Sequence, residues 1–415
     1  MSTKIILSSD GLPLEQSLKK AERKNKIRAL LLVAPLFFFI LIIFVFPLVD
    51  MLFKSVDNRM ITEMLPNTFT ALEKWDGKEL PGEDVYEAFY NDFYPLAKDK
   101  KSGKLFQRLN YEKSGFSSGL KKTNKLILNF EKENYKEQFI NAHEIWNNQD
   151  YWLAIKNSSS KWSYSKYLKG IDLELDQQKK IVQVEEEKSI HVLLWLRTLK
   201  VAFWVTVCCF FLSYPIAYLL ATLPMKYSNI LMICVLLPFW TSLLVRTSSW
   251  MIMLQQEGPI NNTLVWLGLF TNENKPELMH NMVGTFVTMS QILLPFMVLP
   301  LYSVMKNIPS SLMKAGKSLG GTPFMSFMKI YFPLTIPGIG AGCLLVFILA
   351  IGYYITPALV GGASGTLISN VIAYHMKYSL DWAFASALGT MLLVGVLTIY
   401  WIYHKLVGID NIRLG

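Results

Sequence analysis

The sequence predicts an all-α membrane protein with six transmembrane helices. Hydrophobic residues make up 52% of the chain and charged residues only 17%, and the apolar residues gather in long blocks. A helix rises about 1.5 Å per residue, so roughly 20 apolar residues cross the hydrocarbon core of a bilayer. Six runs of about this length occur at residues 29–49, 201–223, 230–254, 282–305, 337–359 and 382–403.

The first run, residues 29–49, is predicted to be a retained membrane anchor. A basic cluster precedes it, formed by Lys19, Lys20, Arg23, Lys24, Lys26 and Arg28. A signal peptide would have a shorter apolar part followed by a small-residue cleavage site. Because basic flanks stay on the cytoplasmic side, residues 1–28 are expected to form a cytoplasmic N-terminus.

Residues 50–195 are predicted to form an inserted extracytoplasmic domain. This stretch is rich in both signs of charge and in Trp, Tyr and Phe. Apolar and aromatic residues recur at mixed helical spacing over 124–140 and 151–168, which favours a mostly helical domain.

Residues 306–335 are predicted to form two short helices at the cytoplasmic face. Ser310 is a candidate N-cap, and one helical face would carry Leu312, Ala315, Gly316 and Leu319. Gly320-Gly321 should end this first helix, and Thr322 should cap a second one with Pro323 at its first position. Pro333 and Pro337 are expected to end the second helix before the next span.

The same segment resembles the cytoplasmic ATPase-docking loop of ABC importer permeases. Residues 312–340 read LMKAGKSLGGTPFMSFMKIYFPLTIPGIG, and the family pattern is E-A-A, three residues, Gly, nine residues, then I-x-L-P. Gly320, Ile330 and Pro333 match that pattern, and Ala315 takes the first alanine. Lys314 stands where the family usually has Glu, Gly316 replaces the second alanine and Phe332 replaces Leu, so the usual ion pair to the ATPase is in doubt.

Four further stretches resemble polyamine-type permeases: YPIAYLLATLP at 214–224, LPFWTSLLVRTSSWMIML at 237–254, GYYITPALVGG at 352–362 and LDWAFASALG at 380–389. The resemblance implies a type I ABC importer permease, with a five-helix core at 196–404 and a cytoplasmic C-terminus at 405–415. It also implies transport of spermidine or putrescine across a bacterial inner membrane. Polyamine-type permeases usually carry a much shorter first external loop, so the role of the insert cannot be inherited from them.

The resemblance also implies the partners. These are a dimer of ABC ATPase subunits, a second permease subunit and an extracytoplasmic substrate-binding protein, with membrane lipid around the spans. ATP would be used by the ATPase, so no cofactor is expected in this chain. The insert would then be either a docking surface for the binding protein or a segment that only packs on the external face.

Several residues are candidates for the translocation path. Arg246 lies inside a span, where a charge costs several kcal/mol unless it serves a site or reaches the headgroups. Tyr353, Tyr354 and Thr356 either line the path, where aromatic faces attract organic cations, or form an interfacial belt. The remaining candidates are Trp240, Trp250, Asp381 and Trp382.

The sequence argues against other classes of protein. It has no HExxH motif and no paired CxxC, so neither a metal site nor an enzyme is predicted. It has no basic soluble surface with interleaved aromatics, which argues against nucleic-acid binding. The alternatives that stay open are import of an opine, an amino-acid derivative or an organophosphonate, or a secondary transporter. The last is disfavoured because spans two to six lack buried carboxylates.

Overall fold

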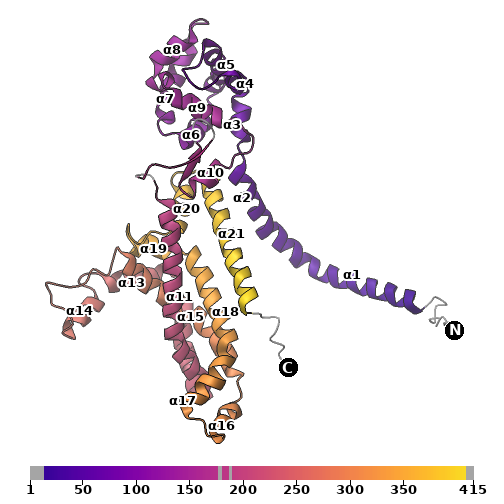
Figure 1. Ribbon diagram of the computed structural model, residues 1–415, viewed down its shortest axis with the longest axis vertical. Coiled ribbons are helices and arrows are strands. Elements are labelled where there is room, and N and C mark those ends of the chain that lie inside the picture. The colour runs from indigo at the N-terminus through magenta and orange to yellow at the C-terminus, as the bar shows by residue number, and fades with distance from the viewer. Residues whose placement is uncertain (1–13, 176–179, 187–188, 408–415) are drawn as a thin grey trace. The chain divides into compact units, whose positions relative to one another are not determined.

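The computed structural model describes residues 14–175, 180–186 and 189–407, and it is mostly helical (Figure 1). It divides into two compact units, Met1–Lys54 and Ser55–Gly415. Of the predicted cytoplasmic tails, residues 1–13 and 408–415 lie outside the described part of the chain.

The first unit carries one long apolar helix. It consists of α1 (Leu14–Ile40), the π-helical turn η1 (Leu41–Val45) and α2 (Phe46–Val56), whose last two residues lie in the second unit. The candidate span within it is Glu22–Val56, with a mean hydropathy of 3.2 and none of its most apolar window buried. The π turn ends two residues before Pro47, and widening the helix there avoids the clash of a proline ring with the preceding turn.

The inserted domain is built from short helices and one small hairpin. Its helices are α3 (Arg59–Met64), α4 (Pro66–Lys74), α5 (Glu83–Lys98), α6 (Gly103–Glu112), α7 (Phe116–Leu126), α8 (Tyr135–Ala142), α9 (Gln149–Asn157) and α10 (Ser165–Lys169), with 3-10 turns η2 (Ile127–Asn129) and η3 (Glu144–Asn147). Strands β1 (Leu173–Leu175) and β2 (Ile181–Gln183) pair antiparallel with Glu174 opposite Val182. The helical character agrees with the prediction, although 124–140 and 151–168 are each divided between two short helices.

Aromatic residues fill the core of the inserted domain. Phe89 stacks on Phe93 at a centroid distance of 5.3 Å and lies edge-on to Trp152 at 5.7 Å. Tyr86 donates a hydrogen bond to the carbonyl of Trp146 at 2.5 Å, and the indole of Trp146 donates to Thr123 Oγ1 at 2.8 Å. Since the polar atoms of these large side chains are paired, the domain has a satisfied core of its own.

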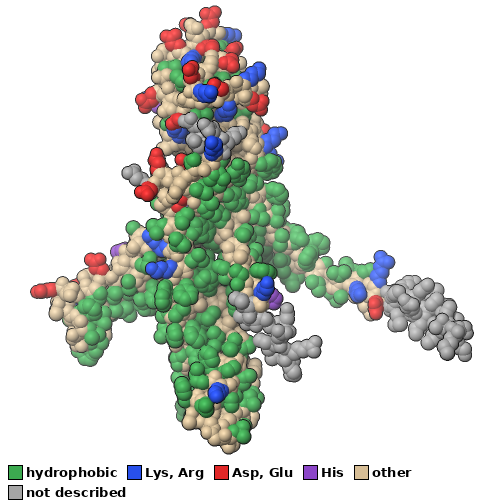
Figure 2. Space-filling view, in the orientation of Figure 1, with side chains coloured by type: hydrophobic (Ala, Val, Ile, Leu, Met, Phe, Trp, Pro, Cys, Tyr) green, Lys and Arg blue, Asp and Glu red, His purple; other side chains and the backbone are tan. Residues whose placement is uncertain are grey.

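The remaining helices form the membrane bundle. They are α11 (His191–Thr222), α12 (Met225–Leu236), α13 (Leu243–Leu254), α14 (Pro259–Trp266), α15 (Met282–Lys306), α16 (Ser310–Ser318), α17 (Pro323–Ser326), α18 (Phe332–Gly352), α19 (Ile355–Val360), α20 (Ile368–Lys377) and α21 (Trp382–Val407), with the 3-10 turn η5 (Leu237–Trp240) and the π turn η6 (Phe327–Tyr331). Figure 2 shows apolar side chains covering this region of the surface, whereas charged ones gather on the inserted domain.

Helices α11, α15 and α18 pack side by side at the centre of the bundle (Figure 1). A Cβ atom on Gly338 would lie 3.0 Å from Val304 Cβ, and one on Gly342 would lie 2.6 Å from Met297 Sδ. These two glycines of α18 therefore allow the close approach to α15 that their four-residue spacing suggests.

The spans agree with the six predicted runs in number but not in every detail. In the described residues five helices are long and apolar enough to cross a membrane, and Met225–Trp240 and Leu243–Trp266 form a pair bent by 99° that makes up to six. The prediction of one continuous span at 230–254 is therefore wrong. The fifth predicted run, 337–359, is also interrupted, because α18 ends at Gly352.

Pro333 and Pro337 do not end the helix that begins after Thr322. One helix runs from Pro323 to Gly352. The π turn η6 ends two residues before Pro333, as η1 does before Pro47. The wider turn accommodates the proline ring, so the helix continues where helix-termination rules predict a stop.

Candidate functional site

Helices α16 and α17 form the predicted helix, turn and helix between α15 and α18 (Figure 1). Thr322 Oγ1 accepts the N–H of Met325 at 3.2 Å and Pro323 takes the first helical position, as the sequence suggests. The N-cap of α16 is Pro309 and not Ser310, which is already inside the helix. Gly320 has a φ of 85°, a left-handed conformation that glycine adopts at helix C-termini without strain.

The turn packs tightly on its inner side and exposes apolar residues on its outer side. A Cβ on Gly316 would lie 2.6 Å from Ile330 Cδ1, and the Gly316 carbonyl accepts the N–H of Gly321 at 3.1 Å. Leu319 is 89% exposed and Phe324 is 75% exposed. This end of α16 and α17 thus presents large apolar side chains that nothing in the described chain covers.

The break in the third span separates α13 from the preceding helices by a bend of 99°. Helix η5 includes Pro238, and Ser242 then caps α13 by accepting the N–H of Val245 at 3.2 Å. The hydroxyl oxygen of Thr247 on α13 lies 3.2 Å from that of Thr356 on α19 (Ile355–Val360). Trp250 donates its indole N–H to Gln291 Oε1 of α15 at 3.0 Å. Both contacts fix α13 against neighbouring helices through polar groups.

Arg246 lies one residue before Thr247 on α13. Its side chain is half-buried, and its Nε and Nη1 atoms are buried with no hydrogen-bond partner among the described residues. A buried cation without a partner is costly, so this position is a candidate for binding a group that the chain itself does not supply.

A second break separates α18 from α19 at Tyr353 and Tyr354. The carbonyls there are held by α20: Ser369 Oγ donates to Tyr353 O at 2.6 Å, and Asn370 Nδ2 donates to Tyr354 O at 2.8 Å. Thr356 is fully buried. The structure thus brings five predicted path residues to one region between α13, α15, α19 and α20, namely Arg246, Trp250, Tyr353, Tyr354 and Thr356.

The other three predicted path residues lie apart from this group. Trp240 is 75% exposed and Trp382 is 53% exposed. Asp381 is buried, and its Oδ1 accepts the N–H of Phe384 at 3.1 Å, which is an N-cap contact at the start of α21. Asp381 therefore caps α21 at the end of this helix that lies beside the inserted domain.

Comparison with known proteins shows to which family the membrane bundle belongs. Residues 212–407 match the model of the binding-protein-dependent transport system inner membrane component family. The chain is 38% identical over 209 residues to the spermidine/putrescine transport system permease protein PotB of Salmonella typhimurium, an alignment that covers 50% of this chain and 72% of that protein. It therefore belongs to this permease family. The chain is a transmembrane permease subunit of an ABC importer and a multi-pass membrane protein.

Two further relatives, both permeases of Escherichia coli, agree with this assignment. The permease is 37% identical to PotB of Escherichia coli over 50% of its own length and 75% of that protein. It is 31% identical to the inner membrane ABC transporter permease protein YdcU of Escherichia coli, over 51% and 71% of the two chains. A crystal structure of a bacterial ABC transporter involved in alginate import is 17% identical with a TM-score of 0.43, covering 52% of the permease and 79% of that chain.

Sequence reasoning missed several residues that support the candidate path of the permease. Gln291 holds Trp250, Thr247 contacts Thr356, and Ser369 and Asn370 hold the second break. Gln291 is a lone amide in an apolar run, which is a signal that could have been used. Ser369 and Asn370 lie outside the spans, and only the fold shows which carbonyls they bind.

Proposed function

We propose that this permease forms, with a second permease subunit, the path by which a bacterial ABC importer moves a polyamine such as spermidine or putrescine across the cytoplasmic membrane. The observation that carries the proposal is the 38% identity over 72% of a permease named for spermidine and putrescine transport. A substrate-binding protein would deliver the polyamine to the outer face. Both termini and the loop between α15 and α18 would be cytoplasmic, in line with the basic residues that flank them.

An ATPase dimer would dock on the loop formed by α16 and α17, and the ATP would be bound and hydrolysed there. The docking residues are those of the family pattern: Lys314, Ala315, Gly316, Gly320, Ile330 and Pro333. Their turn exposes Leu319 and Phe324, which supports an apolar contact with a partner. Because Lys314 replaces the usual Glu, the docking would depend more on these apolar side chains than on an ion pair.

The path would pass the region of the two helix breaks. In membrane proteins irregular backbone is tolerated where it lines a cavity or is buried in protein. Tyr353, Tyr354 and Trp250 would offer aromatic faces to a polyamine, because ring quadrupoles attract ammonium groups. ATP-driven closure of the ATPase dimer would then shift the bundle between inward- and outward-facing states.

Arg246 favours a second candidate substrate class. A guanidinium with buried, unpartnered nitrogens would repel a bare polycation and attract a carboxylate or phosphonate. In some polyamine permeases an acidic residue also stands where this chain has Tyr353. An opine, an amino-acid derivative or an organophosphonate is therefore the alternative cargo.

Uptake into proteoliposomes tests both candidates. The permease would be reconstituted with its co-purified ATPase, second permease and binding protein, and uptake of labelled spermidine, putrescine and octopine would be compared with and without ATP. ATP-dependent spermidine or putrescine uptake is expected. Uptake of octopine alone would support the second candidate, and uptake that needs no ATP would favour a secondary transporter.

A further inference from the structure

The inserted domain contacts the outer ends of three helices of the bundle. Tyr111 of α6 donates a hydrogen bond to the carbonyl of Ser379, in the turn between α20 and α21. The indole N–H of Trp195 in α11 donates to Gly170 O at 2.9 Å. Asp172 caps α11 by accepting the N–H groups of His191 at 3.0 Å and Val192 at 2.7 Å. The domain is therefore joined to the bundle through specific polar contacts and does not merely cover it.

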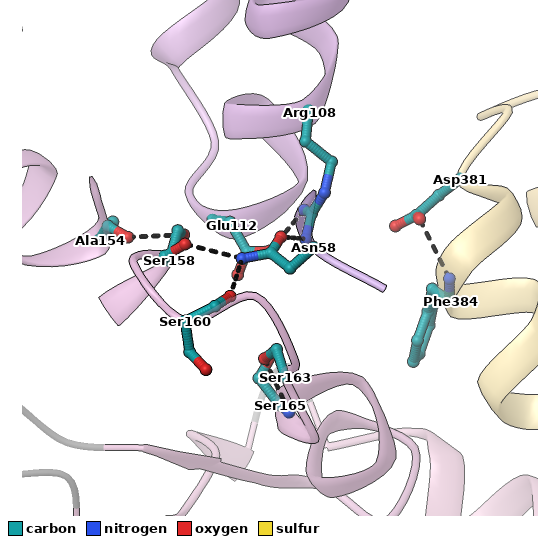
Figure 3. Close-up of polar contacts among 10 residues, drawn as sticks. All are labelled: Asn58, Arg108, Glu112, Ala154, Ser158, Ser160, Ser163, Ser165, Asp381 and Phe384. Atoms are coloured by element: carbon teal, nitrogen blue, oxygen red, sulfur yellow. Dashed lines mark hydrogen bonds and ion pairs between the residues drawn. The ribbon is translucent and has the colours of Figure 1, made fainter. Parts of the chain in front are cut away.

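A buried group of charges lies at this junction (Figure 3). Lys166 of α10 is only 5% exposed, and its Nζ has no hydrogen-bond partner among the described residues. Arg108 forms an ion pair with Glu112 and donates to Asn58 Oδ1 at 2.8 Å. Helix α10, which carries Lys166, packs against α21, the helix that Asp381 caps. A buried lysine without a hydrogen-bond partner costs free energy, so Lys166 does not by itself stabilise the junction.

Helix α20 connects this junction to the second helix break. Its C-terminal end leads into Ser379, which Tyr111 holds. Its N-terminal end carries Ser369 and Asn370, which bind the carbonyls of Tyr353 and Tyr354 at 2.6 and 2.8 Å. A helix of 10 residues is about 15 Å long and behaves as a rigid rod over that length. Displacement of one end of α20 would therefore be transmitted to the other.

We propose that the inserted domain positions the outer part of the translocation path: through Tyr111 it holds the turn between α20 and α21, and through α20 it sets the conformation of the Tyr353–Tyr354 break. This inference rests on the proposed role of the break in the path. It gives the insert a function that the relatives' family model, which matches only residues 212–407, does not contain. Tyr111 is a positioning residue and does not touch the substrate.

Hydrogen exchange measured by mass spectrometry on the full chain in lipid nanodiscs tests the proposal without any substrate. Tyr111→Phe removes one hydroxyl and leaves the aromatic ring. Loss of one hydrogen bond should speed exchange of the 353–361 and 368–379 amides by about three- to tenfold. Tyr151→Phe is the matched control, because Tyr151 donates to the carbonyl of Ser114 at 2.9 Å within the inserted domain.

A second variant, Lys166→Met, removes a buried charge that has no hydrogen-bond partner in the described chain, so exchange of the same two segments should stay at the wild-type rate or slow. Amides of α5 serve as the check that the inserted domain remains folded. Uptake assays should show a lower maximal rate for Tyr111→Phe with an unchanged apparent KM for the loaded binding protein. Exchange at 353–361 that stays at the wild-type rate in Tyr111→Phe, or that rises equally in Tyr151→Phe, would overturn the proposal. Because exchange is measured without cargo, a wrong substrate assignment would leave this result unaffected.

Discussion

The hydroxyl oxygens of Thr247 and Thr356 lie 3.2 Å apart and join the two helices that follow the breaks in the membrane bundle. Thr247 belongs to α13, which begins after the break in the third span, and Thr356 belongs to α19, which begins after the Tyr353–Tyr354 break. Thr356 is fully buried, so the contact is shielded from water. The two breaks are therefore parts of one structural unit.

Coupling between these two threonines is the first prediction. Thr247→Val and Thr356→Val should each lower the free energy of unfolding by about 1 kcal/mol, and the double variant should lose clearly less than the sum. A double-mutant cycle of unfolding in detergent measures this coupling. Thr398→Val serves as a control, because Thr398 bonds only the carbonyl of Val394 in its own helix, at 2.8 Å. Strictly additive losses would show that the contact is not formed.

Replacement of Arg246 should separate transport from stability. Arg246→Met removes a buried charge whose Nε and Nη1 have no partner, so the thermal midpoint should stay the same or rise. If Arg246 acts in the path, uptake should fall at least about tenfold, as expected when a charge-assisted contact of roughly 1.5 kcal/mol or more is lost. Arg197→Met is the control, because Arg197 donates to the Ala363 carbonyl at the surface, at 3.0 Å. A lower midpoint with normal uptake would assign Arg246 a structural role.

The turn between α16 and α17 should tolerate only residues that accept a left-handed backbone. Gly320 has a φ of 85°, and no atom lies within 4 Å of a Cβ added there. Gly320→Asp should abolish uptake while the chain still inserts into the membrane, because it brings a carboxylate to the proposed ATPase contact. Gly320→Asn is the matched variant, since Asn adopts the same backbone without the charge. Normal uptake and ATPase co-purification with Gly320→Asp would count against docking at this loop.

The number of spans could be predicted from the sequence, because the length of an apolar run depends only on the thickness of the bilayer. The breaks could not. The run 230–254 is long enough to cross the bilayer as one helix, and the interruption arises where Pro238 and the Ser242 cap compete with the helical hydrogen bonds. At Pro333, in contrast, a helix end is predicted but none is found, because a π turn accommodates the proline ring and the helix continues.

The candidate path was only partly predictable for a related reason. Arg246 and the tyrosines stand out as polar groups in apolar runs, so composition alone singles them out. Asp381 stands out equally, but it is buried at the start of α21, against which α10 packs, and α10 lies more than 200 residues away in the sequence. Contacts between the insert and the bundle have no periodic signal in the sequence, and only the fold shows them.

The stability of the junction should rise with pH between about 8 and 10. Burial, together with the charge of Arg108, lowers the pKa of Lys166 from 10.5 to about 8, although Glu112 and Asp381 oppose the shift. Above that pKa the unfolded chain keeps a proton that the folded chain has lost, so raising the pH favours the folded state until the unfolded lysine also titrates. Below about pH 7 Lys166 keeps its proton in both states, so its contribution to the free energy of unfolding no longer changes with pH.

Thermal unfolding of the full chain at pH 7.0, 8.5 and 9.5 measures this dependence. The midpoint of the wild type should rise over the series, and the rise should be smaller in Lys166→Met. Lys156→Met is the control, because the amine of Lys156 bonds the carbonyl of Trp75 inside the insert. A rise of equal size in the wild type and Lys166→Met would show that Lys166 is not the titrating group.

The most direct test of the central claim is ATP hydrolysis by the complex purified from native membranes through a tag on this chain and placed in lipid nanodiscs. We expect an ATPase dimer and a second permease to co-purify, and we expect their hydrolysis to rise several-fold when the binding protein loaded with spermidine or putrescine is added. Recovery of the chain without an ATPase, or hydrolysis that neither polyamine stimulates, would contradict the assignment of this chain as the permease of a polyamine importer.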